Sequence, residues 1–186
     1  MKKYILSALV VVVIIVAGYF FIKKEKTLPV INEAPSTSAA FDGKNTSFLI
    51  DGKEITLVNG VSEVEVAPNS ASKITTKYFG NDITGDLTGD GVPDTAYLVT
   101  QTTGGSGVFY YAVVAMKTQS GYKNTNAFFI GDRIAPQNMY IPGGTTELNV
   151  NFAERKAGEP MTARPSQGAV TLLKVTKEGV LEGLMK

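Results

Sequence analysis

The chain has no histidine, no cysteine and no tryptophan among its 186 residues. Without histidine, it cannot use Ser-His-Asp or Cys-His catalysis, histidine-ligated zinc or the commonest general base. Without cysteine, it can form no disulfide and carry no lipid anchor on a cysteine. These absences exclude the most familiar catalytic sites and favour a protein that is not an enzyme.

Charge of either sign is scarce and nearly balanced, with 18 basic and 17 acidic residues. Five of the basic residues and one acidic residue precede residue 27, so residues 27–186 carry a net charge of −3. Nucleic-acid-binding proteins typically show a basic stripe, often with interleaved aromatic residues. The sequence shows no such stripe and therefore predicts no nucleic-acid partner.

The longest uncharged run covers residues 4–22 and is rich in Val, Ile, Leu, Ala and Phe. A helix needs about 20 such residues to cross a bilayer. One interpretation is an uncleaved single-span anchor, and the other is a secretory signal peptide cut after Val16-Ala17-Gly18. We favour the anchor, because the apolar run continues past that point and exceeds the roughly 7–15 residues usual for the apolar region of a signal peptide.

Lysines flank this run on both sides, and the free amino terminus adds positive charge before it. The positive-inside rule then places the amino terminus in the cytoplasm and the bulk of the chain outside. Residues 27–46 are rich in proline and serine and predict a flexible linker. The expected organisation is a membrane anchor or uncleaved signal over 1–26, this linker, and an extracytoplasmic β-rich domain over 47–186. The predicted location is the cell membrane, with a single span.

From residue 47 onward, short apolar or alternating segments are separated by turn signals. Residues 47–50 and 54–58 flank Asp51-Gly52, a dipeptide typical of tight β-hairpins. Residues 108–116 are nearly all apolar and predict a central strand buried on both faces. Further strands are predicted over 61–66, 95–100, 121–130, 133–141, 147–152 and 169–175, and over 73–79, where a short helix is the alternative. The pattern predicts a mainly β domain, an antiparallel meander, sandwich or open barrel, preceded by one N-terminal transmembrane helix.

The main candidate site is the nine-residue segment 86–94, which reads Asp-Leu-Thr-Gly-Asp-Gly-Val-Pro-Asp. Oxygen-bearing side chains stand at its positions 1, 3, 5 and 9, with glycine at position 6. This spacing suits a hard cation held in a sharp turn. The predicted calcium ligands are the side chains of Asp86, Thr88, Asp90 and Asp94 and the backbone carbonyl of Val92. The alternative is a metal-free Asx-turn, in which the aspartates accept hydrogen bonds from backbone amides.

This acidic loop resembles the calcium loops of dockerin modules and of FG-GAP repeats, which also run into a strand. A complete EF-hand would add a bidentate glutamate at position 12, where this chain has Tyr97. Thr88 stands where those loops usually carry aspartate or asparagine. The resemblance implies bound Ca²⁺ with a structural role and an affinity of about 10⁻⁴–10⁻³ M, as in extracellular modules.

A second candidate site lies in two polar stretches, residues 131–137 and 153–166. Asp132, Arg133 and Arg155 form a candidate ligand-binding set, since arginine can clamp an anionic group through two hydrogen bonds. The alternative is a salt bridge of the Asp132–Arg155 type that closes two loops. We favour the salt bridge, because such charge pairs are common.

Segments 57–60, 78–80, 86–94, 103–107, 131–137 and 158–161 together resemble a set of uncharacterised bacterial membrane-anchored envelope proteins. The resemblance spans most of residues 48–176 and implies an exported bacterial domain, but it transfers no activity. The predicted function is a membrane-anchored extracytoplasmic binding or interaction module. Its partners would be the lipid bilayer, through residues 4–22, and an envelope protein or glycan. The alternative is an envelope hydrolase or hydrolase inhibitor that acts on cell-wall glycans.

Overall fold

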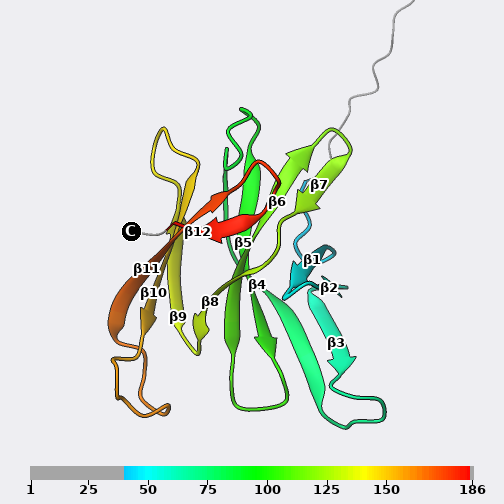
Figure 1. Ribbon diagram of the computed structural model, residues 1–186, viewed down its shortest axis with the longest axis vertical. Helices are drawn as coiled ribbons and strands as arrows, with labels where there is room; N and C mark the ends of the chain where they lie inside the picture. Colours follow the sequence, from blue (N-terminus) through cyan, green and yellow to red (C-terminus); the bar gives the residue numbers. More distant parts are fainter. Residues whose placement is uncertain (1–39, 185–186) are drawn as a thin grey trace, which may run out of the picture. The chain divides into compact units, whose positions relative to one another are not determined.

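The computed structural model describes residues 40–184, which form twelve β-strands and no helix (Figure 1). The strands are β1 Ser47–Ile50, β2 Lys53–Thr56, β3 Val61–Glu65, β4 Lys73–Gly85, β5 Asp94–Thr102, β6 Phe109–Thr118, β7 Gly121–Asn124, β8 Phe128–Asp132, β9 Ala135–Tyr140, β10 Glu147–Glu154, β11 Gln167–Val175 and β12 Leu181–Gly183. All of these strands pair antiparallel. The mainly β, antiparallel class predicted from the sequence is therefore confirmed.

The predicted membrane anchor and most of the predicted linker lie outside the described residues. Among residues 40–184, no helix has the length and apolarity needed to cross a membrane. The folded part begins before residue 47, where the sequence had placed the end of the linker. The ring of Phe41 lies 5.0 Å from that of Tyr97 and 5.2 Å from that of Tyr122, measured between ring centroids.

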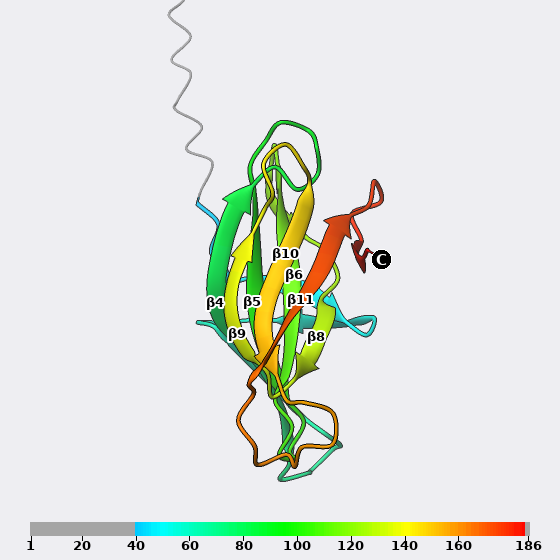
Figure 2. The same cartoon turned by 90° about the vertical axis from the view of Figure 1, so that its left-hand side faces the viewer.

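Two meanders make up most of the fold. The larger sheet has the order β3-β4-β5-β6-β7, with β8 also paired to β6, and the smaller sheet has the order β12-β11-β10-β9. Strands β1 and β2 form a separate hairpin. In Figure 2, β9, β10 and β11 lie in front of β4, β5 and β6. The two sheets thus face each other and curve into half of a barrel.

The larger sheet is covered on both faces, which explains the continuous apolar run of its central strands. An inner core fills the space between the two sheets and contains Leu87, Ala96, Leu98, Ala112, Val114, Ile130, Ile134, Met139, Leu148, Val150, Phe152, Leu173 and Leu181. A hairpin core lies on the opposite face and contains Phe48, Ile50, Leu57, Tyr97, Val99, Tyr111, Val113 and Ala115. Alternate residues of β5 and β6 face the two cores, because successive side chains of a strand point to opposite faces. The prediction that residues 108–116 form a strand buried on both faces is confirmed.

The predicted turn at Asp51-Gly52 closes the β1–β2 hairpin, in which Ile50 pairs with Lys53. Its two central residues have φ angles of 50° and 76°. A two-residue type I′ turn requires positive φ at both positions, which aspartate and glycine tolerate better than most residues. The hairpin signal read from the sequence is therefore confirmed in position.

Two strand predictions differ from the structure. The strand predicted over 73–79 continues to Gly85, through register shifts between Tyr78 and Ile83 that locally increase the twist of β4. The strand predicted over 121–130 is wrong, because the chain breaks at residues 125–127 into β7 and β8. At this break, the Thr125 amide donates to the carbonyl of Val114 at 2.9 Å.

Asn126, in the middle of that break, joins the smaller sheet to the rest of the domain. Its Nδ2 donates to the carbonyl of Leu181 at 3.1 Å, and its Oδ1 accepts the amide of Leu181 at 2.8 Å. The adjacent Ala127 amide donates to the carbonyl of Leu49 at 2.7 Å. The Asn126 side chain thus forms the two hydrogen bonds to β12 that a neighbouring strand would form. The backbone of Ala127 is hydrogen-bonded to the β1–β2 hairpin.

We expect Asn126→Ala to lower the free energy of unfolding by about 1–3 kcal/mol, since the buried amide and carbonyl of Leu181 would lose their partners. Urea unfolding of the full-length protein measures this loss. Asn138→Ala is the control, because Asn138 accepts one exposed hydrogen bond from Asn151 at 3.2 Å. If Asn126→Ala lowers the free energy of unfolding no more than Asn138→Ala does, Asn126 does not join the smaller sheet to the rest of the domain.

Candidate functional site

Asp94, the last residue of the acidic loop and the first of β5, is fully buried. Its Oδ2 accepts the amides of Leu87 and Thr88 at 3.1 Å each, and its Oδ1 accepts the amide of Lys117 at 2.8 Å. A buried carboxylate is costly unless it is hydrogen-bonded, and three amides satisfy it here. Asp94 therefore fixes the start of the loop to β5 and β6.

Asp86 and Asp90 organise the outer half of the loop. Asp86 accepts the amides of Gly89 at 2.6 Å and Gly91 at 2.9 Å, and Asp90 accepts the amide of Val92 at 2.8 Å. Both glycines have a φ of 81°, which other residues rarely adopt. Hydrogen bonds from backbone amides, that of Gly91 foremost, hold the pKa of Asp86 below its usual value. Asp86 is therefore ionised at neutral pH.

The structure places all five predicted calcium ligands in one loop but separates them by depth. Asp94 is buried beneath the loop, whereas Thr88, Asp90 and Val92 are exposed. Within the described range 40–184, no three His, Cys, Asp or Glu side chains are arranged to hold a metal ion. The observed amide bonds are those of the metal-free Asx-turn. Calcium binding by the loop stays a prediction.

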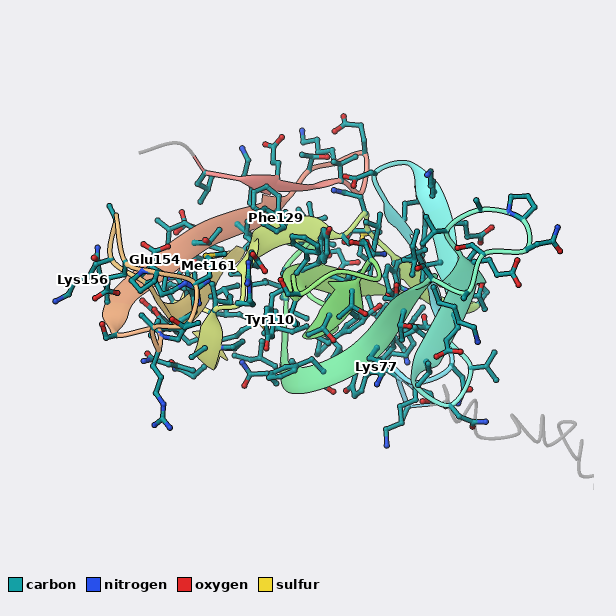
Figure 3. The ribbon with its side chains drawn as sticks, turned by 90° about the horizontal axis from the view of Figure 1, so that it is seen from below. Lys77, Tyr110, Phe129, Glu154, Lys156 and Met161 are labelled. Atoms are coloured by element: carbon teal, nitrogen blue, oxygen red, sulfur yellow. The ribbon has the colours of Figure 1, made fainter. Side chains whose placement is uncertain are left out.

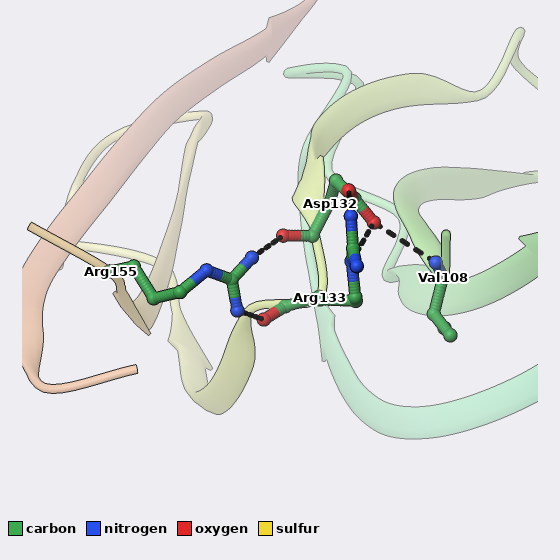
Figure 4. A network of polar contacts seen from close by, with 4 residues as sticks. All are labelled: Val108, Asp132, Arg133 and Arg155. Atoms are coloured by element: carbon green, nitrogen blue, oxygen red, sulfur yellow. Dashed lines mark hydrogen bonds and ion pairs between the residues drawn. The ribbon is translucent and has the colours of Figure 1, made fainter. Parts of the chain in front are cut away.

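The second candidate set lies where the chain passes from the larger sheet to the smaller one, between β8 and β9. Asp132 accepts Nε of Arg133 at 3.0 Å, Nη2 of the same residue at 2.6 Å, and the amide of Val108 at 3.0 Å. Arg155 donates from Nη1 to the carbonyl of Arg133 and from Nη2 to that of Asp132, at 3.1 Å each (Figure 4).

All three predicted residues meet in this network, but their contacts are internal. Asp132 pairs with Arg133, not with Arg155, and Arg155 reaches the same turn through two backbone carbonyls. The network also holds Arg133 at a φ of 50°, in the left-handed region that favours glycine. Both guanidinium groups fix the crossing between the sheets, so the geometry gives no support to an anion clamp.

The loop that follows Arg155 stabilises its own turn. The Lys156 amide donates to Oε2 of Glu159 at 2.9 Å, and the Glu159 amide donates to the carbonyl of Lys156 at 3.1 Å. In Figure 3, Glu154, Lys156 and Met161 lie at the end of the domain where this loop emerges, whereas Lys77 projects from β4 far from it. The three charged side chains among them, Glu154, Lys156 and Lys77, do not point toward a common site.

The structure reveals a cavity that the sequence analysis missed. It has a volume of about 280 Å³ and lies between the β1–β2 hairpin and strands β3, β4 and β5. From the hairpin it is lined by Ile50, Asp51, Lys53, Glu54 and Ile55. From the larger sheet it is lined by Ser62, Val64, Glu65, Val66, Ile74, Thr76 and Gln101. We call this cavity the hairpin groove.

Two buried polar residues, Thr76 on β4 and Gln101 on β5, line the hairpin groove. They are direct cross-strand partners and are only 1% and 9% exposed. Nε2 of Gln101 donates to Oγ1 of Thr76 at 3.1 Å. A glutamine amide offers one acceptor and two donor hydrogens, and within residues 40–184 this is its one hydrogen bond. Gln101 can therefore bind a further polar group.

One sequence signal could have identified Gln101. It stands two residues after Val99 and four after Tyr97 in an apolar strand. The period of two therefore places it on the same buried face as those residues. A buried glutamine at the end of such a row needs hydrogen-bond partners, because buried polar groups are rarely left without one. Its partners come from β4 and the hairpin, which local patterns do not reveal.

No family model, curated protein sequence or solved structure matches this chain. The resemblance to bacterial envelope proteins therefore stays a prediction. What the chain does has to be argued from its fold and from the hairpin groove.

The stability contributed by Asp132 should depend on pH. The hydrogen bond from Arg133, foremost, holds the pKa of the Asp132 carboxyl below its usual value. A carboxyl with a lowered folded pKa stabilises the fold above its unfolded pKa of about 3.9 and loses that effect as the pH falls through the folded pKa. We expect the melting temperatures of wild type and Asp132→Asn to differ most near neutral pH and to converge below about pH 4.

The control repeats this comparison in an Arg133→Gln background, which removes the charge that lowers the pKa of Asp132. The single variant Arg133→Gln is compared with the double variant that also carries Asp132→Asn, so the four proteins form a double-mutant cycle that isolates the pair. The pH dependence should be weaker in this background. If the melting temperatures of wild type and Asp132→Asn differ by the same amount from pH 7 to pH 3, the ionised Asp132 carboxylate does not stabilise the fold.

Proposed function

We propose that this protein is a binding module without catalytic activity, attached to the cell membrane through residues 4–22 with its β domain outside. The hairpin groove is the observation that carries the proposal. Its walls are largely apolar, and its buried polar residues are few and defined in position. Ligand sites in proteins typically combine these two properties.

The surface beside the hairpin groove supports the proposal. Val61, Val64 and Val66, on and just after β3, are 38%, 55% and 50% exposed. Scattered apolar residues are common on protein surfaces, but contiguous ones often mark an interaction site. Here Val64 and Val66 line the groove and are two residues apart, so they share one face, whereas Val61 points to the other face. A partner that covered Val64 and Val66 would bury apolar surface next to the groove.

The alternative, an envelope hydrolase or hydrolase inhibitor acting on cell-wall glycans, has less support. It rests on the acidic loop and on the arginine-bearing loops. In the described part of the chain, the carboxylates of Asp86 and Asp94 accept backbone amides, and Arg133 and Arg155 are engaged in the sheet crossing. A glycosidase would need two carboxyl groups facing one substrate.

Photo-cross-linking in cells that express the full-length protein tests the binding function. A photoreactive amino acid replaces Val64 beside the groove or, as a matched control, Val170, which is 42% exposed on β11. We expect a discrete cross-linked product from position 64 and none from position 170. Equal products from both positions, or none from either, would contradict the proposal. So would turnover of cell-wall fragments that a single substitution abolishes.

We also propose that Ca²⁺ binds the exposed side of the acidic loop and has a structural role. Asp86 is ionised at neutral pH, and Asp90 lies four residues further along the same turn. These two carboxylates on one turn repel each other unless a positive charge offsets them. A cation that binds the folded state alone stabilises it by mass action.

Thermal unfolding of the full-length protein in detergent checks the calcium proposal. With millimolar calcium we expect a melting temperature several degrees above that with chelator, and Asp90→Ala should abolish the difference. Glu182→Ala is the control, since Glu182 is an exposed carboxylate that pairs with Lys174 on the smaller sheet. An equal melting temperature with and without calcium would show that the loop is a metal-free turn.

A further inference from the structure

The geometry of the hairpin groove points to its occupant. We propose that it binds an extended polypeptide segment that pairs with the free edge of β3 and places a lysine side chain in the groove. This inference rests on the proposed function, because it names the class of partner for the same surface. It is argued from the backbone of β3, the lining of the groove and its charge.

Strand β3 offers unpaired backbone groups. It is the outermost strand of the larger sheet, and the Val66 amide just after it donates to the carbonyl of Ser72. The backbone groups of the even-numbered residues in this stretch therefore form the hydrogen bonds to β4. In an antiparallel ladder the backbone groups of the intervening, odd-numbered residues point away from that neighbour. The amides and carbonyls of Glu63 and Glu65 thus face outward, and no strand within residues 40–184 covers them. An added strand is a recurrent way to satisfy such an edge.

An added strand would place alternate side chains on the groove side of the sheet. On β3, Val64 lines the groove and stands between the outward-facing amides of Glu63 and Glu65. A peptide side chain beside Val64 could extend past it into the cavity, along Ile55 and Ile74. These apolar walls suit the straight methylene stem of lysine, which is commonly buried while its ammonium remains hydrated or paired.

The charge of the lining selects a cation. Asp51, Glu54 and Glu65 line the groove with one basic residue, Lys53, among them. Further in, the Gln101 amide is 9% exposed and has capacity for a partner. An ammonium donates three hydrogen bonds and accepts none, so it fits carboxylates and an amide oxygen. An acidic side chain would be repelled by these carboxylates, and an apolar one would offer the Gln101 amide no hydrogen-bond partner.

The probe is a fluorescent, blocked heptapeptide of the sequence Val-Thr-Val-Lys-Val-Thr-Val, titrated against the full-length protein in detergent by anisotropy. Two matched peptides test the two parts of the proposal. One carries glutamine in place of lysine, and the other is N-methylated at alternate residues on its pairing edge. We expect the lysine peptide to bind at least about tenfold more tightly than either, since each control lacks a charge-assisted or a backbone hydrogen bond.

Two pairs of variants locate the binding. Gln101→Leu removes the polar group in the groove, whereas Thr76→Val removes the same internal hydrogen bond but keeps the glutamine. Glu63→Pro removes an outward amide, whereas Glu63→Thr keeps it, and both lose the Glu63–Lys73 ion pair. We expect the first member of each pair to weaken binding of the lysine peptide about tenfold and the second far less. Melting temperatures verify folding, and Glu54→Gln at the rim replaces any variant that fails to fold.

The outcomes separate this inference from the proposed function. Equal affinity of the lysine and glutamine peptides, undiminished binding of the N-methylated peptide, or no binding at all would overturn the inference. If a cross-linked product still forms from position 64 in cells, the binding module stands with a different partner. If both experiments fail, the proposed function fails with the inference.

Discussion

The domain depends on the break at residues 125–127, which separates β7 from β8 within the larger sheet and contacts both the smaller sheet and the β1–β2 hairpin. Within three residues, Thr125 pairs with Val114 on β6, Asn126 pairs with Leu181 on β12, and Ala127 pairs with Leu49 on β1. Asn124, just before the break, donates to Oγ1 of Thr46 at 2.6 Å and so binds the approach to the hairpin as well. Polar side chains, rather than apolar packing alone, therefore set how the hairpin and the smaller sheet meet the larger sheet.

The class of fold was predictable because its signals are local. The positive-φ turn at Asp51-Gly52 and the apolar run over 108–116 each depend on neighbours in the sequence. The division of residues 121–130 was not predicted, although residues 123–126 are all polar. The contact that fixes it joins Asn126 and Leu181, 55 residues apart. Strand β12 was not predicted either, because its three residues are too few to show a strand pattern.

The candidate sites show the same division between local and distant causes. The sharp turn at Gly91 was predicted correctly from spacing, because it depends on neighbours within the loop. The depth of Asp94 was not foreseen, since one of its three donors is the Lys117 amide on β6. The pairing of Arg155 with two carbonyls was equally hidden, because sequence patterns suggest charged partners before backbone ones. The hairpin groove could not be predicted from local patterns, because its lining comes from three separate segments, the β1–β2 hairpin, β3 with β4, and β5.

The meander order has a consequence for how the chain folds. In both sheets nearly every strand pairs with the next strand along the sequence, so most pairings close short loops and cost little chain entropy. Joining the two sheets is different, because it must bring β12 back to the middle of the chain. The contacts between the two sheets therefore carry the largest cost in chain entropy, and they are the ones that limit how fast the domain can fold.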